Sequence, residues 1–295
     1  MSAVPVILNP TAGGGRLLRG RRALDAAASA SGAVLEWWPT DCPGHAEELA
    51  RQAVAEDRPL VLAYGGDGTY NEVARGLLGS ATAMGALPGG TSSVLAYELG
   101  VPRPAARALA PLLAGEDRPM RVGRSDRDDI VLLMLSAGPD SHVLEHLVPT
   151  FKLLGGRAGV ILQAALETVR GDPLPRMSVI LGGKTVEAGW VVVGKSRCYA
   201  GRHRATPGAD PFRDDFEVVV QKSIGRRPAL GFLLGIPAGR HLSRDDVSRE
   251  LVDRVVLAPA PPGAEVPYQI DGDVVGNLPV EVSIDPQPLW VRLPV

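Results

Sequence analysis

The chain has 295 residues, more than one hydrophobic core usually organises, so we expect two domains. Hydrophobic residues make up 45% and charged residues 22% of the chain, as in globular proteins, and the net charge of −2 argues against general electrostatic binding of nucleic acid. The longest apolar runs, 130–135 and 231–236, are far shorter than the ~20 residues that cross a bilayer, so no transmembrane segment is expected. The two cysteines lack C-x-x-C spacing, which favours free thiols in the reducing cytoplasm.

The first third of the chain alternates short apolar runs with segments of helical spacing. The predicted strands are Val4–Leu8, Val34–Trp38, Leu60–Tyr64 and Ala83–Leu87. The predicted helices are Leu17–Ala30, Gly44–Ala55, Tyr70–Leu78 and Ser93–Leu99. Strands that alternate with helices over short glycine turns indicate a mainly parallel sheet with helices on both faces.

Beyond about residue 120, strands become dominant and turn signals such as Gly182-Gly183 separate them. The predicted strands are Ile130–Leu135, Met177–Leu181, Glu187–Val193, Phe216–Gln221, Val252–Leu257 and Val280–Ile284. Two helices are predicted, at Gly159–Arg170 and Arg227–Ile236. The pattern favours an antiparallel sandwich, so we expect an α/β domain over residues 1–122 and a β-rich domain over residues 123–295.

The strongest chemical signal is the run Gly65-Gly66-Asp67-Gly68-Thr69, which joins a predicted strand to a predicted helix. Glycines at such a turn let backbone N–H groups approach phosphate oxygens, and the following helix N-terminus favours negative charge. A carboxylate in a phosphate-binding turn would repel the ligand unless a cation lay between them. Asp67 is therefore interpreted as a contact to nucleotide-bound Mg²⁺, and the alternative is an N-cap in a tight turn.

Two further glycine turns follow predicted strands, at 9–14 and at 88–92. Ligands of open parallel sheets bind outside the carboxyl ends of the strands, so all three turns should gather at one edge. Neither G-x-x-x-x-G-K-[ST] nor G-x-G-x-x-G after a strand occurs in the chain. The sequence therefore predicts a phosphate-binding edge of another type.

These motifs resemble those of the diacylglycerol kinase catalytic-domain family, which includes bacterial lipid kinases and sphingosine and ceramide kinases. Gly65–Thr69 matches its GGDGT motif, Pro88–Thr91 its later glycine-threonine turn, and Gly156–Gly159 a helix start in the second domain. The resemblance extends from Asn9 to Asp273, nearly the whole chain. It implies an N-terminal α/β domain like those of NAD kinase and phosphofructokinase, followed by a C-terminal β-sandwich domain.

The resemblance also implies the ligands, ATP and Mg²⁺, with Asp67 facing the metal. By position, the residues expected to contact ATP are Asn9, Thr40, Gly65, Gly66, Asp67, Gly68, Thr69, Asn71, Gly90 and Thr91. Relatives carry Asp-Gly-Glu near the C-terminus, and its last acid is held to deprotonate the acceptor hydroxyl. This chain has Asp271-Gly272-Asp273, so Asp273 is the expected base, while the alternative is that Asp271-Gly272 forms a hairpin turn.

Three positions depart from the family pattern. Ser93 stands where Asn is usual, and Val122 where many relatives have Asp. Relatives hold a structural Mg²⁺ with an Asp-Gly segment, and Arg213 occupies that Asp position, with Asp210, Asp214 and Asp215 nearby. These three aspartates are candidate metal ligands or part of a solvated acidic loop.

A basic stretch precedes that loop and is interpreted either as a site for ATP phosphates or anionic lipid headgroups, or as a solvated loop. Its members are Lys195, Arg197, Arg202, His203 and Arg204.

The expected function is transfer of the γ-phosphate of ATP to a hydroxyl of diacylglycerol or a related lipid, as a step of phospholipid metabolism. We expect a cytoplasmic protein that meets its lipid at the inner membrane surface, and a homodimer remains open. One alternative is an NAD-kinase-like enzyme, which shares the GGDGT turn. The other is a non-catalytic protein that binds nucleotide or lipid.

Overall fold

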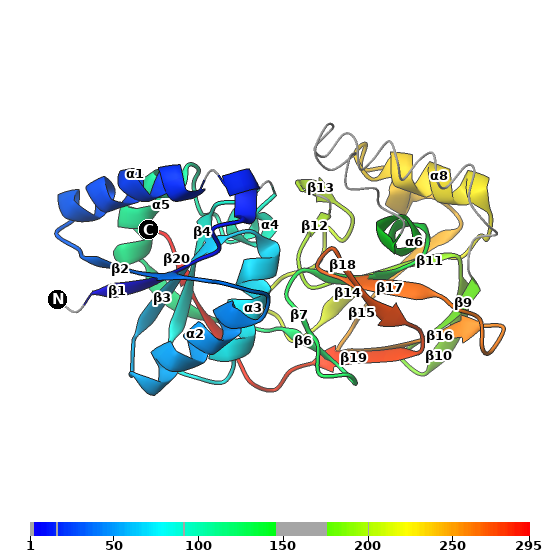
Figure 1. The fold of residues 1–295 in the computed structure, drawn as a ribbon. Coiled ribbons are helices and arrows are strands. Elements are labelled where there is room, and N and C mark those ends of the chain that lie inside the picture. Colours follow the sequence, from blue (N-terminus) through cyan, green and yellow to red (C-terminus); the bar gives the residue numbers. More distant parts are fainter. Residues whose placement is uncertain (1–2, 16, 91, 146–175, 200) are drawn as a thin grey trace. The chain divides into compact units, whose positions relative to one another are not determined.

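The computed structural model describes residues 3–15, 17–90, 92–145, 176–199 and 201–295 (Figure 1). The chain divides into two compact units, residues 1–121 with 286–295, and residues 122–285. Three predicted features, Thr91, the 156–159 motif and the helix Gly159–Arg170, lie outside the described residues. Within the described ranges, no helix combines the length and the apolar character that crossing a membrane requires.

The first unit is built on a six-stranded sheet. In spatial order the strands are β2 (Leu35–Pro39), β1 (Val4–Leu8), β3 (Leu60–Gly65), β4 (Ala83–Pro88), β20 (Leu289–Leu293) and β5 (Glu116–Met120). Every neighbouring pair is parallel except β20 and β5. All residues of β3 and β4 are buried, as expected for central parallel strands with both faces covered.

Helices cover both faces of this sheet (Figure 1). They are α1 (Leu17–Ala30), α2 (His45–Ala55), α3 (Asp67–Leu77), α4 (Val94–Glu98) and α5 (Ala105–Leu113), with a short 3-10 turn at Ala12–Gly15. α1 packs with α5, and α2 packs with α3. The predicted α/β architecture of the first domain is confirmed.

The C-terminal strand shows where the sequence-based division of the chain differs from the structure. The sequence predicts that residues 123–295 all lie in the second domain, but residues 286–295 belong to the first unit. β20 enters the first sheet between β4 and β5, and the side chains of Leu289 and Val291 are fully buried there. Pairing between strands so far apart in the chain leaves no local sequence signal. The residues of 289–293 therefore do not reveal that this strand pairs with β4 and β5.

The second unit contains two antiparallel six-stranded sheets. One has the order β10 (Lys184–Ala188), β9 (Arg176–Leu181), β16 (Arg254–Ala260), β19 (Val280–Ile284), β6 (Gly123–Ser125) and β7 (Ile130–Val131). The other has the order β15 (Val247–Val252), β14 (Phe216–Gln221), β11 (Trp190–Gly194), β8 (Met134–Ala137), β17 (Pro267–Ile270) and β18 (Asp273–Asn277).

One hydrophobic core joins the two sheets. Val179 and Val255 of the first sheet lie in the same buried cluster as Val191 and Val218 of the second. Both sheets thus place alternate side chains in a shared layer, so the predicted β-sandwich is confirmed.

Shorter elements complete the second unit: β12 (Cys198–Tyr199), β13 (His203–Arg204), α6 (Pro139–Glu145), α8 (Arg226–Gly235) and a 3-10 turn at His241–Ser243. α8 covers the outer side of the second sheet, where the ring of Phe232 lies 5.1 Å from that of Trp190 (Figure 1). Such an aromatic pair anchors a helix by burial and by ring geometry together.

Three predicted strands are broken by turns. The run Ile130–Leu135 divides into β7 and β8, Glu187–Val193 divides between β10 and β11 at Gly189, and Val252–Leu257 divides between β15 and β16 at Asp253. At the first two breaks the residues are apolar or glycine, so hydrophobicity alone gives no boundary there, whereas the charged pair Asp253-Arg254 marks the third break.

Candidate functional site

The three glycine turns meet at the carboxyl edge of the first sheet, as the sequence predicts. The carbonyl oxygen of Gly65 accepts hydrogen bonds from the N–H groups of Gly89, at 2.9 Å, and Gly90, at 2.7 Å. A Cβ atom on Gly90 would lie 2.7 Å from the Cα of Gly66, and one on Gly13 would lie 2.7 Å from the Gly89 carbonyl oxygen. These approaches are possible only without side chains, so glycine here is required by contact between the turns.

Asp67 is the first residue of α3, and its carboxylate reaches across to a second helix. Gly66, in extended conformation, is the N-cap of α3, so the alternative in which Asp67 serves as that N-cap is not what the structure contains. The Oδ1 atom of Asp67 accepts the N–H of Leu95, in the first turn of α4, at 3.0 Å. A carboxylate has about four lone-pair directions, so it can accept this hydrogen bond and also face a metal or its water. Asp67 therefore fits a nucleotide-bound Mg²⁺, which typically uses one or two protein carboxylates.

Gly68 is exposed, whereas Thr69 and Asn71 on the same helix are buried. A Cβ atom on Gly68 would have no atom of the described residues within 4 Å, so open space lies beside the first turn of α3 in that part of the chain. The buried Thr69 hydroxyl accepts a hydrogen bond from Asn9 Nδ2 at 3.3 Å, which ties the turn after β1 to the turn after β3. Asn71 is also buried, and its Oδ1 atom accepts a hydrogen bond from Arg75 Nε at 3.0 Å.

A cavity of about 170 Å³ lies at the same edge of the sheet. Its lining residues are Asn9, Thr11, Thr40, Asp41, Cys42, Pro43, Ala46, Thr69 and Glu72. It is smaller than the 300–1,000 Å³ usual for a whole drug-sized ligand, so it suits one part of a nucleotide. Three residues predicted to contact ATP line this cavity, namely Asn9, Thr40 and Thr69.

Three residues of this edge were not among the predicted ATP contacts. Thr11 donates through both its N–H and its hydroxyl to Asn9 Oδ1, at 3.0 and 2.8 Å. Glu72 accepts the N–H of Ala46 at 3.2 Å and so caps the start of α2. Arg103 donates to the carbonyl oxygens of Gly90 and Ser92, at 2.9 and 3.0 Å, and holds the third glycine turn from outside. Such contacts depend on the fold, and only Asn9-x-Thr11 has the spacing of a local Asx turn.

Ser93, one of the departures from the family pattern, has a left-handed backbone with φ of 47°. Asn tolerates this region better than Ser does. The Ser93 hydroxyl lies 3.4 Å from the carbonyl oxygens of Gly65 and Gly90, so it contacts two of the glycine turns. The substitution therefore retains a small polar side chain at the meeting point of the turns.

The Asp271-Gly272-Asp273 motif forms the hairpin turn between β17 and β18. Both Asp271 and Gly272 have positive φ, 54° and 101°, as in a type I′ turn. The Asp271 carboxylate accepts three backbone N–H groups, those of Leu132 at 3.1 Å, Leu133 at 2.8 Å and Met134 at 3.0 Å. Asp271 is thus a structural residue, which pairs the backbone N–H groups at the break between β7 and β8.

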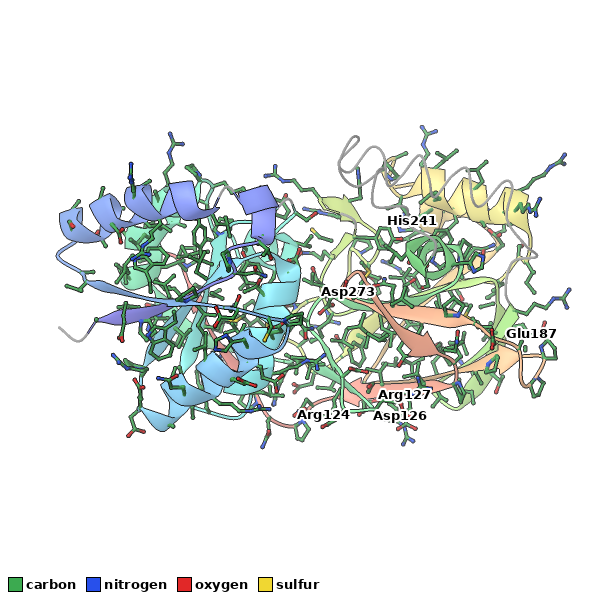
Figure 2. The ribbon with its side chains drawn as sticks, viewed as in Figure 1. Arg124, Asp126, Arg127, Glu187, His241 and Asp273 are labelled. Carbon is green, nitrogen blue, oxygen red and sulfur yellow. The ribbon has the colours of Figure 1, made fainter. Side chains whose placement is uncertain are left out.

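Asp273, two residues later, is in a different environment. It is the first residue of β18, and its side chain is exposed (Figure 2). Among the residues that the structure describes, the Asp273 carboxylate has no hydrogen-bond or ion-pair partner. The sequence left a hairpin role and a base role open for the motif, and the structure assigns the hairpin to Asp271 and leaves the Asp273 carboxylate accessible.

The candidate metal ligands in the second unit do not come together. Both carboxylate oxygens of Asp215 bind the Arg213 guanidinium, at 2.6 to 3.2 Å, and Asp210 Oδ1 accepts the N–H of Phe212 at 2.9 Å. Over the described part of the chain, no three Asp, Glu, His or Cys side chains, Asp214 included, are grouped to hold a metal ion.

Comparison with known proteins matches two family models that follow one another along the chain. Residues 3–125 match the diacylglycerol kinase catalytic domain, and residues 134–293 match the YegS C-terminal NAD kinase beta sandwich-like domain. A diacylglycerol kinase of Mycobacterium tuberculosis is 28% identical over 256 residues, which cover 84% of this chain and 81% of that protein. A diacylglycerol kinase of Bacillus subtilis is 38% identical over 88 residues, 29% of each chain. A solved structure from Bacillus anthracis superposes with a TM-score of 0.81 at 20% identity, covering 99% of this chain and 95% of that one, and so supports the fold alone.

Proposed function

The chain belongs to the diacylglycerol kinase catalytic-domain family, and on that premise we propose that it transfers the γ-phosphate of ATP to a hydroxyl of diacylglycerol or a related lipid. One observation carries the proposal. Three glycine turns converge beside Asp67, at a helix N-terminus that faces open space at Gly68. Backbone donors, a helix N-terminus and one carboxylate are the groups that bind a nucleotide triphosphate with its metal.

The glycine turns would bind the phosphates through backbone N–H groups. α3 begins at Asp67 and runs to Leu77, so the N–H groups of its first turn lack a partner within the helix and form its positive dipole end. The open space beside Gly68 leaves room for phosphate oxygens there. Mg²⁺ bound with ATP neutralises phosphate charge, and Asp67 would hold it. The cavity lined by Asn9, Thr40 and Thr69 then receives another part of the same nucleotide.

Asp273 would act as the general base. It accepts the proton of the lipid hydroxyl as the oxygen forms a bond to the γ-phosphorus, and the bond between that phosphorus and the bridging oxygen breaks to release ADP. An exposed carboxylate without an internal partner is available for this proton, whereas the Asp271 carboxylate is committed to three N–H groups. Little covalent chemistry is required of the protein in such a transfer, so positioning and charge stabilisation account for most of the catalysis.

The acceptor is met at a membrane. Each buried methylene of an acyl chain adds roughly 0.8 kcal/mol of membrane affinity, so a two-chain lipid resides in the bilayer. We place the reaction at the cytoplasmic surface of the inner membrane, with ATP supplied from solution.

The test is transfer of label from γ-labelled ATP, with Mg²⁺ and detergent, into a total bacterial lipid extract and, in parallel, into NAD. Label in the organic phase is expected. Label in NAD alone would identify an NAD-kinase-like enzyme. Tight ATP binding by the folded protein with no labelled product in either assay would indicate a nucleotide-binding protein without kinase activity, and would also overturn the proposal.

A further inference from the structure

Lys195, which follows β11, carries a completely buried ammonium group. Its exposed fraction is 0%. Its Nζ donates to three backbone carbonyl oxygens of one loop, those of Asp210 at 2.9 Å, Arg213 at 2.5 Å and Asp215 at 3.1 Å. The sequence-based interpretation of Lys195 as a phosphate ligand or a solvated side chain is therefore wrong for this residue.

The arrangement satisfies the ammonium group fully. An ammonium has three N–H donors, and the loop offers three acceptors, so no donor is left unpaired in the interior. An unpaired buried charge would cost several kcal/mol, which explains why the loop folds around the group. Burial lowers the pKa of Lys195 to about 8, so the side chain is still protonated at neutral pH.

Carbonyl oxygens that converge on one point are also how proteins bind hard metal ions. Here the point of convergence is filled by nitrogen. The carboxylates that would complete a metal site have other partners: Asp215 binds Arg213, Asp210 binds the N–H of Phe212, and the buried Glu217 accepts the N–H of Gly208 at 2.6 Å. A divalent ion in this loop would have to displace the ammonium and break these bonds.

We propose that the Lys195 ammonium is the structural cation of segment 206–217, and that this segment binds neither Mg²⁺ nor Ca²⁺. The inference is independent of the proposed kinase activity, because it concerns how the second unit is held together. It changes the expected metal requirement of the protein. Metal removal should affect the nucleotide step alone and leave the second unit folded.

The same backbone also meets the turn that carries Asp273. The N–H groups of Lys195 and Ser196 donate to the Leu133 carbonyl oxygen, at 2.8 and 2.9 Å. The N–H of Leu133 in turn donates to Asp271. The backbone at Lys195 and the Asp271 turn are thus both bonded to Leu133, the first through its carbonyl oxygen and the second through its N–H.

The test is thermal unfolding of the nucleotide-free full chain, in chelator and in added Mg²⁺ or Ca²⁺. Wild type should show the same Tm in all three solutions. Lys195→Met removes the cation and leaves three carbonyl groups unpaired, so its Tm should fall by about 5–10 °C. Lys222→Met, at an exposed lysine, is the matched control and should retain the wild-type Tm. A wild-type Tm that falls in chelator and recovers with metal would overturn the proposal, as would an unchanged Tm for Lys195→Met.

A second measurement applies if Lys195→Met does not fold. Mn²⁺ binding to the nucleotide-free protein is followed by electron paramagnetic resonance, with Asp67→Asn alongside to remove the carboxylate of the first unit. No Mn²⁺ should bind to Asp67→Asn. If that variant binds stoichiometric Mn²⁺, Asp210, Asp214 and Asp215 are also changed to Asn. Binding that is lost in the second variant would place the ion in the loop and contradict the proposal. Binding that persists would place the ion outside the loop, and the proposal would stand.

Discussion

The glycine turns of the first unit and the charged loops of the second unit position their groups in opposite ways. In the first unit, backbone packs directly on backbone, as Gly90 does on Gly66. In the second unit, charged side chains hold the backbone: Asp271 accepts three N–H groups, and Lys195 donates to three carbonyl groups. Asp67, the expected metal ligand of the first unit, therefore lies within the packed glycine turns. Asp273 is instead exposed, and the turn that carries it is held by other residues. Substitutions that lower activity and substitutions that lower stability should therefore fall on different residues most clearly in the second unit.

The largest effect is expected for Asp67→Asn. Asn retains an Oδ1 atom to accept the Leu95 N–H but loses the charge that we propose holds Mg²⁺. We expect kcat to fall by about 10³-fold or more with an unchanged Tm, since loss of one electrostatic contact to a transition state costs about 10²–10³-fold or more. Steady-state kinetics and thermal unfolding check both parts. Activity within a few-fold of wild type would remove Asp67 from the mechanism.

Asp273→Asn should have the next largest effect. Loss of a general base typically lowers kcat by about 10²–10⁴-fold. Because the side chain is exposed, the Tm and the affinity for ATP should stay at wild-type values. Kinetics with ATP and lipid, together with nucleotide binding by calorimetry, measure these quantities. A variant with full kcat would exclude Asp273 as the base.

Asp271→Ala should affect stability instead. It leaves three N–H donors without their acceptor and places Ala at a φ of 54°, so we expect the free energy of unfolding to fall by about 2–4 kcal/mol. Asp271→Asn keeps one acceptor oxygen and tolerates the backbone better, so it should lose less. Denaturant unfolding provides the comparison with Asp273→Asn. Equal stability of Asp271→Ala and Asp273→Asn would refute the assignment of separate roles within one motif.

Two glycine substitutions sharpen the contrast within the first unit. Gly68→Ala adds a Cβ atom to open space in the first turn of α3, so stability should hold or rise by up to about 1 kcal/mol, while KM for ATP rises about tenfold. Gly90→Ala forces a Cβ atom to 2.7 Å from Gly66 Cα, so it should lower the Tm itself. If Gly68→Ala left KM for ATP unchanged, the open space would not be the phosphate site.

The smallest effect concerns acid stability of the second unit. The Arg244 guanidinium hydrogen-bonded to Asp246 lowers the pKa of that carboxyl to about 2, below the ordinary aspartate value. The unfolded chain then binds more protons than the folded chain between about pH 4 and pH 2, so the stabilisation is present above that window and lost as pH falls through it. The stability difference between wild type and Asp246→Asn should shrink over this range. The exposed neighbour Asp245→Asn is the control, and a difference independent of pH would contradict the ion pair.

The glycine turns could be predicted from the sequence because their signals are local. Each turn combines an apolar run with glycines, and the rule for parallel sheets placed all three at one edge. The same local logic identified the Asp271-Gly272 hairpin and α1, whose predicted and observed bounds coincide. Where a residue's role depends on neighbours within a few positions, periodicity and turn chemistry were sufficient.

Contacts between distant segments could not be predicted in this way. β20 pairs with strands far earlier in the chain, and Arg103, which lies beyond α4, donates to the Gly90 carbonyl oxygen. Lys195 was placed with exposed basic residues because its spacing gives no sign that a loop 15 to 20 residues later closes over it. Burial of a charge is a property of the folded chain, and composition does not reveal it.

The most direct test of the proposed function is the transfer of labelled phosphate from γ-labelled ATP into extracted lipid by wild type and Asp273→Asn, measured side by side on protein of equal Tm. We expect a labelled organic-phase product with wild type and a product at least about 10²-fold slower with the variant, although both bind ATP equally. The absence of labelled lipid with wild type, or equal rates for the two proteins, would contradict the proposal that Asp273 deprotonates a lipid hydroxyl for transfer from ATP.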